Sequence, residues 1–442
     1  MRIVNVIVTL NATDLFTLPP QADQLVIPIP LDQRSVVSTN AWDVLNRENV
    51  PSAGPLSDLL RLAITVYTAD QIISRKQEGY QGWSRHIRVY FPVSDLVRWQ
   101  TVQEDLQNML SFLSGDRWEF YFRQAAPAGA ALVTHANTAP PVTAVSLFSG
   151  GLDSLVGVID LLEAGHTIGL VSHYKKGSEH MAQEALYRAL ESHYGTHRMR
   201  RFEFYVQPSQ RKRNPLARKE GTSRARSFLF LALGLNITSI APVSLDLVVP
   251  ENGLISLNVP LTDTRLSSHS TRTTHPHYFD LFRSVLRGLG IGNSVDNPYQ
   301  LRTKGEMMRQ CGNQALLAAV YPESISCSHA DNSRLQPGSR PGIHCGYCVP
   351  CIIRQAAEHA YQGIHTEYVH QIKINPPNHV TGKGRDLRAF KMALEELNGL
   401  ATHSVMLRVL KAGPLPIPNQ THLEGYIGTY QRGMAEVRNF LV

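Results

Sequence analysis

The chain has 442 residues, of which 43% are hydrophobic and 18% are charged, and its formal net charge is +7. This composition excludes a largely disordered chain, and the length allows two or three domains that each bury a core. No apolar run reaches the ~18–20 residues that span a bilayer, and residues 1–8 resemble a strand rather than a signal peptide, so we expect a cytoplasmic protein without a membrane partner.

The first 123 residues alternate predicted strands with predicted helices. Strands are predicted over 3–9, 24–29, 86–91 and 118–122, and helices over 56–69 and 96–113. We interpret residues 1–123 as a separate α+β domain for recognition of a partner or substrate, because no motif in it carries recognisable chemistry. Residues 124–142 are rich in Ala, Pro, Gly and Thr, and this composition predicts a linker.

A glycine-rich turn follows the linker. Residues 145–148 are predicted to form a buried strand and residues 155–162 the first turns of a helix. The turn between them is Ser149, Gly150, Gly151, Leu152, Asp153 and Ser154. Two adjacent glycines let the backbone approach a phosphate closely, at the positive end of the helix dipole. We therefore predict an ATP-binding loop in which Asp153 holds Mg²⁺ or orients the departing pyrophosphate; a turn that needs glycine only for its geometry is the alternative.

The segment after this turn alternates strands over 167–172 and 201–206 with a helix over 179–191. Such alternation predicts an α/β fold with a parallel sheet covered by helices on both faces, in which ligands bind beyond the carboxyl ends of the strands. His173 and Tyr174 follow the second strand at that edge and are candidate substrate-binding residues, for example for adenine or ribose. Ordinary loop positions are an equally good interpretation of both.

Residues 198–226 are strongly basic. The charge could neutralise RNA phosphates, or it could belong to a mobile loop that closes on a triphosphate, or it could be a solvated surface. No stacking aromatic residues are interleaved between 207 and 227, so nucleic acid is a possible partner that we do not favour. Arg226 differs from the others because it opens the apolar helix predicted over 227–235, and it is a candidate catalytic residue.

Two further charged residues follow in turn-like contexts. Glu251 comes directly after a predicted strand over 245–249, where a carboxylate could form hydrogen bonds to the polar edge of a heterocycle or bind Mg²⁺. The alternative is that Pro-Glu-Asn-Gly is only an ordinary turn sequence. Lys304 opens a predicted helix and could reach a phosphate.

Four of the five cysteines lie within residues 327–351, at Cys327, Cys345, Cys348 and Cys351. Four soft thiolates in this pattern favour a structural, tetrahedral Zn²⁺ site, although an iron–sulfur cluster could use the same ligands. Cys311 is predicted to be a buried apolar residue.

These motifs together resemble the QueC family, the 7-cyano-7-deazaguanine synthases, which belong to the ATP pyrophosphatases with a pyrophosphate loop (PP-loop). The resemblance covers about residues 143–365, with the zinc cysteines included, and leaves residues 366–442 as a C-terminal extension, which we expect to be helical. It rests on the loop Ser149–Ser154, on Ala225-Arg226-Ser227, where the family has asparagine in the last position, on Lys304-Gly305-Glu306, and on the four cysteines. The chain departs from the family in its length, in its basic stretch and in the long gap between Cys327 and Cys345.

Long QueC-like proteins with an extra N-terminal domain occur in anti-phage defence operons of the Qat type. The resemblance implies that ATP adenylates a 7-deazaguanine carboxylate, and that the adenylate then reacts with an amine. The product would be an amide, a nitrile or a modified partner protein. A tRNA-modifying ATP pyrophosphatase and a nucleotide-binding scaffold without turnover are the competing hypotheses.

Overall fold

The computed structural model describes residues 2–19, 24–33, 36–126, 140–174, 177–208, 220–241, 243–262, 272–331 and 342–442. Most of the predicted linker and the basic run over 211–219 lie outside the described residues. Arg334 and Arg340, which lie in the long gap between the first two zinc-type cysteines, are also outside them.

The first part of the chain forms a four-stranded sheet with the order β2-β1-β4-β5, and every pairing in it is parallel. Its strands are β1 (Ile3–Thr9), β2 (Gln24–Pro30), β4 (His86–Val93) and β5 (Arg117–Gln124). Its helices are α1 (Ala41–Arg47), α2 (Pro55–Ile72), α3 (Arg75–Glu78), α4 (Leu96–Thr101) and α5 (Gln103–Ser114). Our expectation of an α+β domain is wrong, because a sheet with only parallel strands and connecting helices is an α/β arrangement.

The second sheet has five parallel strands in the order β11-β10-β6-β7-β8. These strands are β6 (Ala144–Leu147), β7 (Ile168–His173), β8 (Met199–Phe204), β10 (Leu247–Val248) and β11 (Val295–Asp296). Val145 and Leu147 pack on the side of α8 (Arg226–Thr238) and α10 (Pro276–Gly288). Ile168 and Leu170 pack on the opposite side, against α6 (Leu152–Glu163) and α7 (Ser178–Tyr194). The predicted α/β fold with helices on both faces of a parallel sheet is therefore confirmed for this part.

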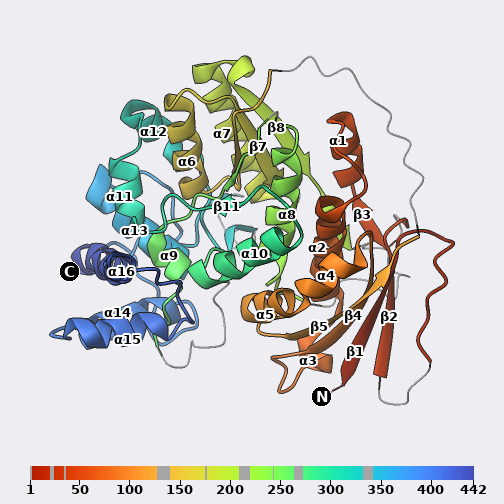
Figure 1. Ribbon diagram of the computed structural model, residues 1–442. Helices are drawn as coiled ribbons and strands as arrows, with labels where there is room; N and C mark the ends of the chain where they lie inside the picture. The colour runs from red at the N-terminus through yellow and green to blue at the C-terminus, as the bar shows by residue number, and fades with distance from the viewer. Residues whose placement is uncertain are drawn as a thin grey trace.

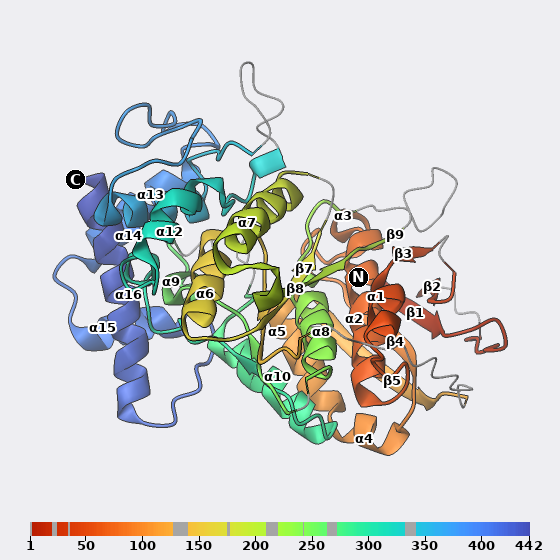
Figure 2. The same ribbon diagram turned by 90° about the horizontal axis from the view of Figure 1, so that it is seen from above.

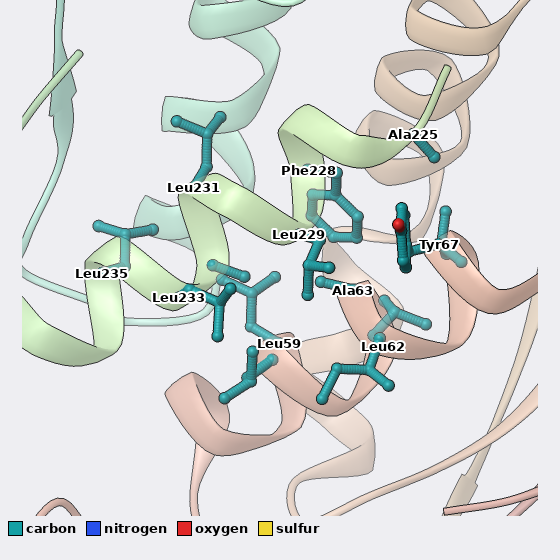
Figure 3. Close-up of a cluster of buried hydrophobic side chains, with 14 of the residues drawn as sticks. Leu59, Leu62, Ala63, Tyr67, Ala225, Phe228, Leu229, Leu231, Leu233 and Leu235 are labelled. Atoms are coloured by element: carbon teal, nitrogen blue, oxygen red, sulfur yellow. The ribbon is translucent and has the colours of Figure 1, made fainter. Parts of the chain in front are cut away.

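The two sheets are joined by packing of α2 against α8, which lie side by side between them (Figures 1 and 2). Leu59, Leu62 and Ala63 of α2 belong to the same cluster of buried side chains as Phe228 and Leu229 of α8 (Figure 3). One hydrophobic core runs continuously from the first sheet through these helices to the second sheet. The first part of the chain is therefore not the separate body that we expected.

A short antiparallel ribbon also connects the two parts. It pairs β3 (Val37–Thr39) with β9 (Val206–Pro208), which follows β8. Next to it, the side chain of Asn40 accepts a hydrogen bond from Tyr205 N–H at 2.7 Å and donates to the carbonyl of Glu203 at 3.0 Å. This strand pairing and the shared core hold β8 and α8 against the first part of the chain.

The remainder of the chain is mainly helical and packs beside the second sheet (Figure 1). Its helices are α9 (Gly253–Leu257), α11 (Lys304–Arg309), α12 (Gln314–Val320), α13 (Val349–Tyr361), α14 (Arg385–Leu397), α15 (Thr402–Leu410) and α16 (Gln420–Leu441). Short 3-10 helices cover Tyr321–Glu323, after α12, and Thr196–Arg198, between α7 and β8. Helix α16 packs along α13 and α9, so the C-terminal extension is helical and belongs to the body of the protein. Among the described residues, no helix combines the length and the apolar character that a bilayer crossing requires.

Candidate functional site

The glycine-rich loop lies between β6 and α6, at the carboxyl edge of the second sheet. Gly150 has a left-handed backbone with φ of +82°, and a Cβ atom there would lie 3.1 Å from Gln183 Cγ and 3.2 Å from the carbonyl oxygen of Glu179. Gly151 is the N-cap of α6 and has no side chain to bond the first N–H groups of the helix. Glycine is therefore required at position 150, and the start of α6 presents backbone donors that an anion can bind.

Hydrogen bonds of the two serine hydroxyls stabilise the conformation of this loop. Ser149 Oγ accepts a hydrogen bond from Gly151 N–H at 3.2 Å and donates to Ser154 Oγ at 3.2 Å, and Ser154 Oγ donates to the carbonyl of Gly151 at 2.9 Å. Ser149 is exposed, whereas Ser154 is buried. The loop is thus held in shape without a ligand, and Ser149 is the hydroxyl that solvent or a substrate can reach.

Asp153 lies in the first turn of α6 and is 6% exposed. Its Oδ1 forms an ion pair with the ammonium group of Lys304, the first residue of α11. Its Oδ2 accepts hydrogen bonds from the backbone N–H and the side-chain amide of Asn252, at 3.0 and 2.7 Å. Burial alone would raise the pKa of Asp153, but the charge of Lys304 and the hydrogen bonds outweigh burial and hold that pKa well below its usual range. Asp153 is therefore an ionised carboxylate whose charge is already neutralised.

Glu251 shares a hydrogen bond with Asp153. Burial, and then the negative charge of Asp153, raise the pKa of Glu251 well above its usual value. Glu251 therefore holds its proton to higher pH than an ordinary glutamate does, and it shares that hydrogen bond with Asp153. The structure thus brings together Asp153, Glu251 and Lys304, which come from three separate parts of the chain.

Arg226 lies at the first position of α8 and is held by two residues of the neighbouring strand and helix. Its Nη1 and Nη2 donate to the two carboxylate oxygens of Glu179 at 3.2 and 2.7 Å, and Nη2 also donates to the carbonyl of His173 at 3.1 Å. The carbonyl oxygen of Glu179 also faces Gly150. The start of α7 therefore lies between Arg226 and the glycine-rich loop.

His173 and Tyr174, the predicted substrate contacts, lie in different environments. His173 is fully buried, with Nε2 at 3.2 Å from the carbonyl oxygen of Val206, and its ring meets the ring of Tyr67 edge-on at 5.6 Å. Tyr174 is half-buried and stacks on His180 at 4.7 Å. In the described structure His173 is a core residue that supports Arg226, whereas Tyr174 keeps an accessible ring.

The start of α8 is positioned by the first part of the chain. Asp70 of α2 is fully buried, and its Oδ2 accepts hydrogen bonds from the backbone N–H groups of Arg224 and Ala225 at 2.7 and 3.0 Å. Its Oδ1 pairs with Arg75 and Arg85, each at 2.7 Å. A carboxylate at a helix N-terminus both caps the helix and complements its dipole. The first part of the chain therefore determines where Arg226 lies.

The four cysteines Cys327, Cys345, Cys348 and Cys351 converge, with their sulfur atoms all within 4.8 Å of one another. Backbone N–H groups point at the sulfurs, from His329 and Cys345 to Cys327 Sγ at 3.3 Å each, and from Cys348 to Cys345 Sγ at 3.4 Å. Gly346 makes the turn possible, since its φ is +81° and a Cβ there would lie 1.8 Å from the carbonyl oxygen of His370. The arrangement could hold a metal ion, and four thiolates in a closed cluster suit a structural Zn²⁺. Cys311 lies outside the cluster and is buried, which confirms the prediction made from the sequence.

The cysteine cluster and the glycine-rich loop are direct neighbours. Ile325 N–H donates to the carbonyl of Gly150 at 2.8 Å, and Ser326 Oγ accepts from Leu152 N–H at 3.2 Å. Cys327 is the next residue in the chain. A metal that holds Cys327 would therefore also hold the segment that contacts the loop.

Comparison with known proteins provides no relative from which a function could be transferred. No family model, no curated protein and no solved structure matches this chain.

The donor sets differ in how well they fit the expected metals. The cysteine cluster fits Zn²⁺ by ligand type and proximity. At Asp153 the ammonium group of Lys304 already occupies one oxygen and Asn252 the other, so this carboxylate does not form a ready Mg²⁺ site. Burial and the charge of Asp153 raise the pKa of Glu251, which makes Glu251 a poorer Mg²⁺ ligand than an ordinary glutamate.

A second group of potential metal ligands consists of His180, Glu184 and Glu203. Arg201 lies among them, with Nη2 at 2.5 Å from Glu184 and 2.6 Å from Glu203. Because this guanidinium already neutralises both carboxylates, the group is better described as a surface ion-pair network.

Sequence reasoning missed Asn252, Glu179 and Ser326. Asn252 was part of an apparent turn, although an asparagine before a short helix is a capping signal, and it does cap α9. Glu179 and Ser326 carried no signal, because only the folded chain brings them to the loop and to Arg226.

Proposed function

We propose that this protein is a QueC-like, ATP-dependent enzyme that adenylates the carboxylate of a 7-deazaguanine and transfers the acyl group to an amine. The observation that carries the proposal is the pairing of Asp153 with Lys304 at the N-terminus of α6, next to a left-handed Gly150. A buried ammonium group beside the N-terminus of a helix favours the binding of a polyphosphate.

In this proposal, the loop binds ATP and two cationic side chains stabilise the leaving group. The N–H groups at the start of α6 and the hydroxyl of Ser149 bind the β- and γ-phosphates. The substrate carboxylate attacks the α-phosphorus, the bond from that phosphorus to the bridging oxygen breaks, and pyrophosphate leaves. Lys304 and Arg226 stabilise the negative charge that grows on the leaving group. Mg²⁺, which ATP normally carries, would add charge neutralisation at the phosphates.

The cysteine cluster has a structural part in this proposal. Cys327, Cys345, Cys348 and Cys351 would hold a Zn²⁺ ion whose contribution is to fix the fold of the segment before α13. Through Ser326 that segment supports the loop, since Ser326 Oγ bonds to Leu152 N–H.

The acyl-adenylate then reacts with an amine, which displaces AMP and gives an amide. Ammonia would lead to an amide or, with a second ATP, to a nitrile. An amine of a partner protein would give a deazaguanine-modified protein, as would suit an anti-phage defence operon. The first part of the chain would recognise such a partner.

ATP–pyrophosphate exchange with and without 7-carboxy-7-deazaguanine tests the proposal. We expect that the wild type exchanges pyrophosphate only when the acid is present, and that Asp153→Asn loses this exchange. Asp280→Asn, which alters an exposed aspartate on α10, is the control and should exchange like the wild type. Intact-mass analysis of co-expressed operon neighbours would identify a protein acceptor. Exchange that needs tRNA instead of the acid would replace the proposal with a tRNA-modifying function, and ATP binding without exchange would favour a scaffold.

A further inference from the structure

A cavity of about 270 Å³ lies beside the cysteine cluster, between α9, α13, α14 and α16. Apolar side chains from all four helices form about half of its wall, including Leu254, Ile353, Phe390 and Met434. Cys348 also lines it, so the wall includes one member of the cluster. Apolar walls with a few polar groups are characteristic of small-molecule sites.

Polar groups form the other half of the cavity wall. Asn258 lines the cavity from the end of α9, where its backbone has a left-handed φ of +50°. Arg385 lies at the start of α14 with a side chain that is 55% exposed, and its Nε pairs with Asp386 Oδ1 at 3.5 Å. Asp386 Oδ2 also accepts a hydrogen bond from Val349 N–H at 3.1 Å. The wall therefore contains an amide, and a carboxylate and a guanidinium group that pair with each other.

Two chain segments connect this cavity directly to the glycine-rich loop. Ser326 bonds to Leu152 N–H in the loop, and Ser328, two residues later, lines the cavity. Asn252 bonds to Asp153, and Leu254, again two residues later, lines the cavity. Two residues span at most ~7 Å, so the cavity wall begins within about that distance of the residues that hold the loop.

We propose that this cavity binds the heterocyclic ring of the acid that is activated at the loop, an inference that rests on the proposed function. Ligand sites for drug-sized molecules usually measure ~300–1,000 Å³, so a cavity just below that range suits a bicyclic ring and not a whole nucleotide. The apolar side chains would pack on the ring faces, and Asn258 and Asp386 would meet its amide edge. The guanidinium group of Arg385 would attract the negatively charged acid.

In this proposal, the C-terminal extension forms part of the substrate site. Phe390 of α14 and Met434 of α16 belong to the segment beyond the region of family resemblance, and both lie in the cavity wall. The extension would therefore complete the substrate site rather than only enlarge the protein.

Calorimetric binding of 7-carboxy-7-deazaguanine to the full chain, saturated with α,β-methylene-ATP, tests this assignment. Met434→Trp would fill the cavity and should weaken binding of the acid more than 10-fold while leaving the affinity for the ATP analogue unchanged. Met392→Trp makes the same replacement at a half-exposed position on α14 and should bind the acid like the wild type. Arg385→Gln alters an exposed side chain, so it should fold normally and bind the acid about 5-fold more weakly.

The outcomes separate the two proposals. Suppose that the protein performs acid-dependent exchange, but that Met434→Trp and Arg385→Gln both bind the acid as tightly as the wild type. That result would overturn the cavity assignment and leave the proposed function standing. Absence of both binding and exchange in the wild type would overturn the proposed function and this inference with it. If Met434→Trp does not fold, Arg385→Gln decides, and unchanged binding in that variant rejects the cavity.

Discussion

The ammonium group of Lys304 pairs with the carboxylate of Asp153 across 151 residues of sequence, and the two side chains are only 4% and 8% exposed. Neither charge could stay ionised at such burial without the other, since an unpaired buried charge costs several kcal/mol. We predict that Lys304→Met destabilises the protein by about 3–5 kcal/mol and abolishes exchange. Urea unfolding measures the first effect, with exposed Lys391→Met as the control.

The double variant Asp153→Asn with Lys304→Met completes this test. It removes both charges, so it should recover a large part of the stability while exchange remains absent. Equal stability of Lys304→Met and the wild type would contradict a buried ion pair.

Gly150→Ala should abolish binding of ATP. The left-handed backbone alone costs an alanine ~1–2 kcal/mol, and the new Cβ would also press on Gln183 and Glu179. Gly165→Ala is the matched control, because Gly165 has φ of +93° with nothing within 4 Å of the added Cβ. Fluorescence titration with an ATP analogue should show loss of binding only in Gly150→Ala, and similar affinities in the two variants would disprove the role of close packing.

The cysteine cluster should bind one metal ion, and loss of that ion should weaken the glycine-rich loop. Elemental analysis should find zinc in the wild type and in Cys311→Ser, whose cysteine lies outside the cluster, but not in Cys348→Ser. Because Ser326 precedes Cys327 and contacts Leu152, chelation should also lower the affinity for ATP. A metal-free protein with full affinity for ATP would show that the cluster does not support the loop.

The raised pKa of Glu251 predicts a specific dependence of stability on pH. Its pKa in the folded state lies well above the ordinary value of 4.5, so its stabilising contribution is complete below that value and is lost as pH rises towards the folded pKa. Glu251→Gln keeps a neutral hydrogen-bonding group and should remove this loss. As pH rises above the ordinary pKa of 4.5, the melting temperature of the wild type should fall relative to that of Glu251→Gln.

The control for this pH profile is Glu395→Gln, which alters an exposed glutamate on α14. Its melting temperature should follow that of the wild type at every pH. Parallel profiles for Glu251→Gln and the wild type would mean that Glu251 is ionised at neutral pH.

The packing of α2 on α8 predicts that both sheets unfold together. Leu229 is fully buried in the shared core, and Leu229→Ala should lower the free energy of unfolding by about 2–5 kcal/mol. Leu407→Ala, at a position that is 58% exposed on α15, should change it by less than ~0.5 kcal/mol. Circular dichroism and intrinsic fluorescence should report one common transition, and two separate transitions would contradict a single core.

Much of the second sheet was predictable from local sequence. The strand and helix around the glycine-rich loop were expected over 145–148 and 155–162, and the structure places them at Ala144–Leu147 and Leu152–Glu163. Strong hydrophobic periodicity and a turn that only glycine can adopt are local properties, and the spacing of three cysteines within seven residues is local as well.

Other features were beyond local reasoning. The helix expected over 96–113 is interrupted at Val102, and the strand expected over 245–249 contains only Leu247–Val248. Alternation of apolar and polar residues is the same in parallel and antiparallel strands, so it could not reveal that the first sheet is parallel. The role of His173 as a buried support for Arg226 likewise depends on neighbours that are distant in sequence.

The sequence by itself determined the strand and helix around the glycine-rich turn, the turn itself and the cysteine pattern, because each depends on residues that are close together in the chain. Only the tertiary structure decided that Lys304 neutralises Asp153, that the pKa of Glu251 is raised, and that α2 and α8 share one core. The charge state of a buried group is set by its burial and by its neighbours in space, and both exist only once the chain has folded.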